Sequence, residues 1–137
     1  MSYLLDTNAV IALLKDKSPR LARRVRQCSP GDLAISSIVL HELYLGAFKS
    51  QKVQSNLQVL DRLGFRVLDF TPEDARQSGR VRAELAGSGT PIGPYDALIA
   101  GQAIERGLIL VTRNGREFSR IQNLRCEDWE SGSAAPV

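Results

Sequence analysis

The chain has 137 residues, of which 43% are hydrophobic, and this length and composition fit one domain with a sizeable core. No apolar run approaches the roughly 20 residues needed to cross a bilayer, and the N-terminus lacks the basic and apolar regions of a signal peptide, so we expect no membrane association. The net charge of +3 is weak evidence for nucleic acid by itself. Arginine outnumbers lysine, however, and its guanidinium makes bidentate contacts with phosphate.

The sequence offers few soft metal ligands. His41 is the single histidine, which argues against a histidine-rich zinc site. Cys28 and Cys126 are far apart and have no metal-binding spacing. We interpret them as reduced structural thiols, with a disulfide as the alternative. Reduced thiols predict a cytoplasmic protein.

Strand-like and helix-like segments alternate along the chain. Residues 2–5 are apolar and predict a strand, after which Thr7 or Asn8 can cap a helix that ends near Leu14. Ser18 and Pro19 begin a second helix, which we expect to turn its arginines, Arg24 among them, largely outward. The remaining elements are predicted as a strand at 33–35, a helix from Ser36 and Ser37 to Lys49, a helix at 51–63 ended by Gly64, a strand at 65–70, a helix from Thr71 to Ala86, a loop at 87–94, a helix ended by Gly107, a strand at 108–111, a short helix at 115–121 and a strand near Arg125.

This alternation predicts an α/β sandwich with a mainly parallel central sheet. We expect residues 1–130 to form the domain and residues 131–137 to be a disordered tail. Sites in parallel sheets lie beyond the carboxyl ends of the strands, so side chains that follow the strands are candidates for function.

Four acidic residues lie beside apolar segments near such strand ends, and burying a carboxylate is costly unless it is paired or bound to a metal. They are Asp6, Glu42, Asp96 and Glu117. Each has an ordinary explanation when taken alone. Asp6 could be a helix cap, Asp96 an acid favoured in the first turn of a helix, and Glu42 and Glu117 could lie on solvated faces. Together they suggest one shared cause, a bound cation.

Carboxylate oxygens without histidine or cysteine favour Mg²⁺ or Mn²⁺ over zinc. Such a cation would lower the pKa of the attacking water and stabilise the charge that develops on a phosphate. We therefore predict a Mg²⁺ site, with Mn²⁺ as a substitute, formed by the four acids.

An ordered set of motifs then resembles the PIN-domain ribonucleases, and more narrowly the VapC-type toxins of toxin–antitoxin pairs. The set comprises Leu5-Asp6-Thr7-Asn8, Ser36-Ser37 with Glu42, Ile92-Gly93-Pro94-Tyr95-Asp96, and Val111-Thr112-Arg113-Asn114 with Glu117-Phe118. The resemblance extends from Leu4 to Trp129. Each motif alone is weak evidence, whereas the ordered set is specific.

The resemblance implies a three-layer α/β/α fold, Mg²⁺- or Mn²⁺-dependent cleavage of RNA, a homodimer and a small VapB-like antitoxin. It assigns metal binding to Asp6, Glu42 and Asp96. The fourth acid is ambiguous, because many relatives have Asp where this chain has Asn114, while Glu117 matches an acid found in others. Residues expected to orient the carboxylates by hydrogen bonds, or alternatively to act as caps and turn formers, are Thr7, Asn8, Ser37, Thr112 and Asn114.

The arginines near the Glu117 loop are the preferred candidates for RNA contact, namely Arg113, Arg116 and Arg120. The arginines of the second helix are an alternative that a solvated helix face explains equally well. Tyr44, Leu45 and Phe48 are interpreted as core or dimer interface, and Trp129 as a packing residue.

The predicted function is a Mg²⁺-dependent endoribonuclease toxin that acts on structured RNA such as tRNA and is inhibited by a cognate antitoxin. One alternative is a metal-dependent nuclease for DNA or general RNA processing. An alternative from another class is a catalytically silent nucleic-acid-binding protein, against which the complete carboxylate set argues.

Overall fold

The computed structural model describes residues 2–131 and contains a five-stranded parallel sheet with the strand order β3-β2-β1-β4-β5. The strands are β1 (Tyr3–Leu5), β2 (Leu33–Ser36), β3 (Arg66–Leu68), β4 (Ile109–Val111) and β5 (Arg125–Glu127). The helices are α1 (Thr7–Leu14), α2 (Pro19–Gln27), α3 (Ser37–Lys49), α4 (Val53–Asp61), α5 (Pro72–Gly87), α6 (Pro94–Arg106) and α7 (Gly115–Phe118), with a 3-10 turn at Pro30–Asp32.

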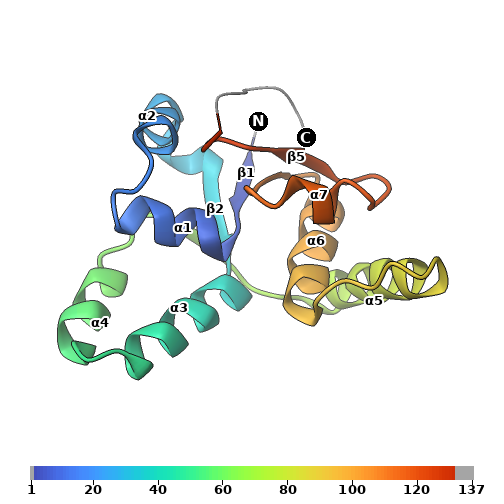
Figure 1. The fold of residues 1–137 in the computed structure, drawn as a ribbon, viewed down its shortest axis with the longest axis horizontal. Coiled ribbons are helices and arrows are strands. Elements are labelled where there is room, and N and C mark those ends of the chain that lie inside the picture. The colour runs from blue at the N-terminus through green and yellow to red at the C-terminus, as the bar shows by residue number, and fades with distance from the viewer. Residues whose placement is uncertain (1, 132–137) are drawn as a thin grey trace.

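Helices cover both faces of the sheet. Figure 1 shows α1 and α2 on one side of the strands and α5, α6 and α7 on the other. The central strands β1, β2 and β4 are almost entirely buried and, apart from Ser36 at the end of β2, consist of hydrophobic residues, as expected for strands covered on both faces. The predicted three-layer α/β/α fold is therefore confirmed.

Several predicted element ends were wrong by a few residues. The first helix is capped by Asp6 rather than by Thr7 or Asn8, because Oδ1 of Asp6 accepts a hydrogen bond from the backbone N–H of Ala9 at 2.8 Å. Helix α4 ends at Asp61 with Arg62 as its C-cap, so Gly64 does not end it. The short helix α7 stops at Phe118, three residues before the predicted end at Ile121.

Arg24 also departs from the prediction that it faces outward on α2. Its guanidinium carbon lies 4.7 Å from the ring centre of Trp129 and 5.5 Å from that of Tyr3. Its Nη2 donates to the hydroxyl of Tyr3 at 3.3 Å and lies 3.8 Å from Glu127. The arginine thus fastens α2 to β1 and β5 through cation–π contacts, and Trp129 is buried as predicted.

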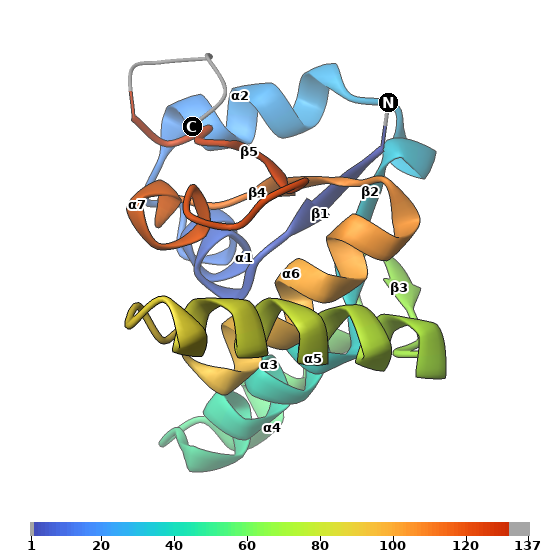
Figure 2. The same ribbon diagram turned by 90° about the vertical axis from the view of Figure 1, so that its right-hand side faces the viewer.

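Helices α5 and α6 pack closely against each other (Figure 2). A Cβ atom at Gly101 would overlap the backbone of Ser78, so only glycine permits this approach. The fully buried Asp74 accepts hydrogen bonds from Gln102 at 2.9 Å and from Arg106 at 3.0 Å. Asp74 also closes the predicted N-terminal cap of α5 with Thr71. This network fixes α6, the helix that carries Asp96.

Towards the C-terminal end of the described chain, the exposed Ser131 is hydrogen-bonded through its backbone N–H and its hydroxyl to Asp128. The rest of the predicted tail, residues 132–137, lies outside the described residues. No helix within residues 2–131 is long and apolar enough to cross a membrane.

Candidate active site

Asp6 lies at the carboxyl edge of the sheet, immediately after β1. Its backbone N–H donates to the carbonyl of Val111 at 3.1 Å, which ties it to the end of β4. The residue is only 6% exposed. Burial raises the pKa of Asp6 to about 6, against opposing hydrogen bonds from Thr112 and Ala9, and the negative charge of Asp96 adds to the rise. The environment of Asp6 therefore disfavours the ionised form of its carboxyl group.

Asp96 lies in the first turn of α6 and is half-buried. Burial raises its pKa, and the charges of Glu42 and Glu117 raise it further. These electrostatic effects require proximity, so the structure brings the four predicted acids to one region. Asp96 interacts electrostatically with each of the other three. Helices α1, α3, α6 and α7 therefore deliver one carboxylate each, that of α1 through its cap.

Glu42 is positioned by Thr7. The hydroxyl of Thr7 donates to Oε1 of Glu42 at 3.0 Å, which links the first turn of α1 to α3. Among the other predicted orienting residues, the hydroxyl of Thr112 accepts from the backbone N–H of Asn114 at 2.9 Å and is buried next to Asp6. Ser36, rather than Ser37, caps α3 through Ile38 at 3.0 Å.

Glu117 is engaged by an arginine. Nη2 of Arg120 lies 2.7 Å from Oε2 of Glu117, and its Nη1 donates to the carbonyl of Thr90 at 2.8 Å. Arg120, a predicted RNA contact, thus ties α7 to the loop before α6. Asn114 is exposed and its side chain does not cap α7. Asn8 is also exposed.

The PIN domain family model matches residues 3–124. This match spans nearly the whole domain and contains all four acids. The chain belongs to the PIN-domain family.

Similar proteins place the chain more narrowly. It is 46% identical over 131 residues to a tRNA(fMet)-specific endonuclease VapC of Shigella flexneri, covering 94% of this chain and 98% of that protein. It is 40% identical over 131 residues to ribonuclease VapC2 of Haemophilus influenzae strain Rd, with the same coverage of 94% and 98%. Within the PIN-domain family the chain therefore belongs with the VapC proteins, as the motifs indicated.

Solved structures of relatives agree. The chain matches VapBC from Salmonella typhimurium bound to DNA with a TM-score of 0.89 and 44% identity, over 94% of this chain and 98% of the other. It matches VapBC2 from Rickettsia felis bound to a promoter DNA fragment with a TM-score of 0.88 and 36% identity, over 94% and 99%. Both of these structures are of VapBC bound to DNA.

One acid of this PIN-domain site was missed by the sequence analysis. Glu130 follows the buried Trp129 and lies close enough to Asp6 for its charge to contribute to the raised pKa of that residue. Asp128 accepts from the backbone N–H of Glu130 at 2.8 Å and so shapes the turn that returns Glu130 to the sheet edge. The acidic Glu-Asp-Trp-Glu sequence at 127–130 was the available signal.

The donor chemistry fits a hard divalent cation, although no group of three or more acidic, histidine or cysteine side chains in residues 2–131 is placed to hold one as it stands. Glu42 and Glu117 are turned to Thr7 and Arg120 by the hydrogen bonds described above. Mg²⁺ keeps several waters and needs only one or two direct carboxylates. Asp6 and Asp96, whose raised pKa values reflect uncompensated burial and like charge, are the residues best suited to hold it.

Proposed function

We propose that this protein is a Mg²⁺-dependent endoribonuclease, with Mn²⁺ as a substitute, and the toxin of a pair with a VapB-like antitoxin. The observation that carries the metal requirement is that Asp96 is half-buried near Glu42 and Glu117, an arrangement that raises the pKa of Asp96. Converging carboxylates repel both one another and an RNA phosphate, and a divalent cation relieves both repulsions. When bound, the cation would polarise the scissile phosphate and lower the pKa of the attacking water.

The residues of the chain have distinct parts in this proposal. Asp6 and Asp96 hold the cation, and Thr7 holds Glu42 so that its free oxygen is available to the attacking water or the cation. Glu117 completes the acidic wall. The relatives include a tRNA(fMet)-specific endonuclease, so tRNA(fMet) is the substrate to test first.

The antitoxin is proposed to occupy an apolar groove that ends at the acids. The groove has a volume of about 350 Å³ and lies between α1, α3 and α4, with Leu14, Leu43, Val59 and Leu60 among its lining residues. Glu42 belongs to the same lining. An amphipathic segment laid in this groove could therefore place a basic side chain against the carboxylates, where it would compete with the cation.

A homodimer is proposed through the exposed face of α3. Leu45 is 50% exposed and Phe48 is 63% exposed on this helix. Tyr44 is instead fastened to α4, because its hydroxyl donates to Asp61 at 3.2 Å. A Phe48→Glu variant should shift the chain towards monomer in light scattering, whereas a wild type that is monomeric at micromolar concentration would contradict the dimer.

The experiment that tests the nuclease is cleavage of a tRNA(fMet) transcript by the purified chain with Mg²⁺, Mn²⁺, Ca²⁺ or EDTA. We expect cleavage with Mg²⁺ and Mn²⁺, little with the larger Ca²⁺, and none in EDTA. Asp96→Asn, which is nearly isosteric, should lower the rate more than about 100-fold, since even partners of metal ligands are worth roughly 10–100-fold. Equal cleavage by Asp96→Asn, or undiminished cleavage in EDTA, would overturn the metal-dependent assignment.

A further inference from the structure

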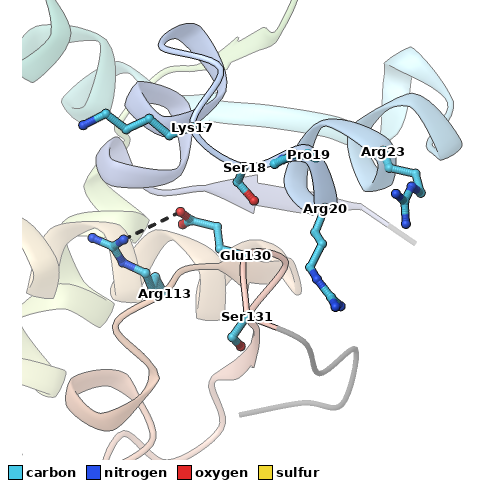
Figure 3. A pocket seen from close by; sticks show the side chains of 8 residues that line it. All are labelled: Lys17, Ser18, Pro19, Arg20, Arg23, Arg113, Glu130 and Ser131. Atoms are coloured by element: carbon cyan, nitrogen blue, oxygen red, sulfur yellow. Dashed lines mark ion pairs between the residues drawn. The ribbon is translucent and has the colours of Figure 1, made fainter.

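A basic pocket lies beside the acids, on the side of α2 and β5. We define it by four cationic side chains, Lys17, Arg20, Arg23 and Arg113, together with Ser18 and Glu130. Figure 3 shows these residues around one hollow, with Arg113 and Glu130 pointing towards each other. The hollow has a volume of about 600 Å³. Its lining therefore combines four cations with one carboxylate, which leaves a clear excess of positive charge.

The charges of the basic pocket are largely uncompensated. Within residues 2–131, Lys17, Arg20 and Arg23 form no ion pair. Arg113 approaches Glu130 only to 3.9 Å, and its side chain is 68% exposed. Arg24, on the same helix, contrasts with them because Tyr3, Trp129 and Glu127 occupy its guanidinium.

The start of α2 adds to this field. Ser18 caps the helix through the backbone N–H of Leu21 at 3.2 Å, and no acidic residue lies in the first turn. The positive end of the helix dipole therefore meets the cationic side chains without a counter-charge. The helix dipole and the four cationic side chains therefore all favour a negatively charged ligand.

The basic pocket is joined to the active site by two residues. Arg113 directly follows Thr112, whose side chain lies next to Asp6 and lowers the pKa of that carboxyl. Glu130 lines the basic pocket and also lies close enough to Asp6 to influence it electrostatically. The basic pocket therefore borders the acidic site at Arg113 and Glu130.

We propose that the basic pocket binds a backbone phosphate of the RNA substrate, at a nucleotide that flanks the phosphate cleaved at the acids. The inference rests on the proposed nuclease function. A carboxylate cluster repels RNA, and the neighbouring guanidinium groups supply the attraction that the cluster lacks. Arginine is suited to the role because its planar fork makes bidentate contacts with phosphate oxygens.

The first test measures binding without cleavage. All variants carry Asp96→Asn, and a fluorescein-labelled tRNA(fMet) transcript is titrated by fluorescence anisotropy at several KCl concentrations. Arg20→Gln with Arg23→Gln should weaken binding about tenfold, and should flatten the slope of log Kd against log[KCl] by about 1.5, since each lost phosphate contact contributes roughly 0.7–0.9. The matched control is Arg76→Gln with Arg82→Gln, two exposed arginines of α5, which should leave both quantities unchanged.

The second test uses the same pairs of substitutions in the active chain. Loss of a flanking phosphate contact should raise KM about tenfold and leave kcat nearly unchanged, because the contact is the same in the ground state and the transition state. Thermal melting of each variant confirms that the fold is retained. If the Arg20 and Arg23 pair matches the control in slope and in KM, the basic pocket is not an RNA subsite.

If the proposed nuclease function is wrong, the unsubstituted chain cleaves no RNA with either Mg²⁺ or Mn²⁺. The binding titration then still shows whether the basic pocket binds RNA. The same variants are also mixed with the purified antitoxin. Loss of antitoxin binding with unchanged RNA binding would assign the basic pocket to a protein partner and overturn the inference.

Discussion

The hydroxyl of Thr7 donates a 3.0 Å hydrogen bond to Oε1 of Glu42, and this bond joins α1 to α3 through two residues that are 35 positions apart in the chain. Thr7 is the first residue of α1, so its position is set by the Asp6 cap that precedes it. The helix cap formed by Asp6 therefore fixes the position of Thr7, which is the hydrogen-bond partner of Glu42. The two carboxylates are coupled through one turn of backbone.

Thr7→Val should lower cleavage and apparent Mn²⁺ affinity by about 10–100-fold, the range seen when a group that orients a metal ligand is removed. The side chain keeps its shape but loses the donor to Glu42. Thr7→Ser is the matched control, because it keeps the hydroxyl and should retain most of the activity. The measurement is the cleavage rate over a Mn²⁺ titration. A normal Thr7→Val enzyme would show that Glu42 needs no orientation.

Asp6 should make the metal-free protein less stable as pH rises. Its pKa is raised to about 6 in the fold. Between roughly pH 4 and pH 6 the folded state binds a proton that the unfolded state has lost, so the free energy of unfolding falls through that interval. Asp6→Asn keeps the Oδ1 acceptor for Ala9 and removes the charge, and should stabilise the metal-free protein at pH 7 by up to about 3 kcal/mol.

Urea unfolding of both proteins in EDTA, at pH 4 and pH 7, checks this expectation. The advantage of Asp6→Asn should be small at pH 4, full at pH 7 and reduced when Mg²⁺ is added, because the cation stabilises only the charged form. An advantage that shrinks from pH 4 to pH 7 would show that burial does not disfavour this carboxylate.

Asp74 should have the opposite linkage. Burial alone would raise its pKa, but hydrogen bonds from Arg106, the backbone of Thr71 and Gln102 outweigh it and lower the pKa. Its stabilising charge is thus present at neutral pH and is lost as pH falls below the usual range for aspartate. Asp74→Asn should cost about 2–3 kcal/mol at pH 7, since the partly exposed Arg106 loses its buried partner.

The check on Asp74 is urea unfolding at neutral and at acid pH, where the difference from the unsubstituted protein should narrow. Glu73→Gln is the control, because Glu73 is exposed in the same helical turn and should change stability by only a few tenths of a kcal/mol. Equal effects of the two substitutions would show that the buried pair contributes no stability.

The parts of the site that the sequence predicted are those that depend on local pattern. Asp6 and Thr112 follow apolar strands, and Asp96 follows a loop rich in glycine and proline at the start of a helix. Because the carboxyl ends of parallel strands lie at one edge of the sheet, the sequence predicts that these residues lie close together. Glu130 depends instead on the pairing of β5 with β4, which places Glu127 opposite Val111. The acidic residues at 127–130 mark Glu130 as a candidate, but no local signal reveals the register that brings it near Asp6.

The role of Arg24 was missed for a related reason. Helical periodicity separates the arginines of α2 from its apolar residues, but the partners of Arg24 are aromatic rings from the two ends of the chain, Tyr3 and Trp129. Those rings themselves meet at 4.9 Å in an edge-on contact. Only the folded sheet brings them together, so the pattern of one helix could not separate Arg24 from Arg20 and Arg23.

The fourth acid can be decided by comparing Glu117 with Asn114. Glu117 acts on Asp96 electrostatically and is half-buried, whereas Asn114 is exposed and contacts Thr112 only through its backbone N–H. A neutral amide oxygen is also a weaker ligand for a hard dication than a carboxylate. Glu117→Gln should therefore reduce apparent Mn²⁺ affinity about tenfold or more, and Asn114→Ala should have a smaller effect.

Arg120 makes this comparison informative in both directions. It holds Oε2 of Glu117 at 2.7 Å, so Glu117 must share its charge between the guanidinium and a cation. Arg120→Gln removes the competitor, and if Glu117 serves the metal, the variant should keep or improve Mn²⁺ affinity even where it loses stability from the contact with Thr90. The opposite result would be a normal Mn²⁺ affinity in Glu117→Gln and a strongly reduced Mn²⁺ affinity in Asn114→Ala. Glu117 would then be a partner of Arg120 alone, and Asn114 would hold the fourth position of the site.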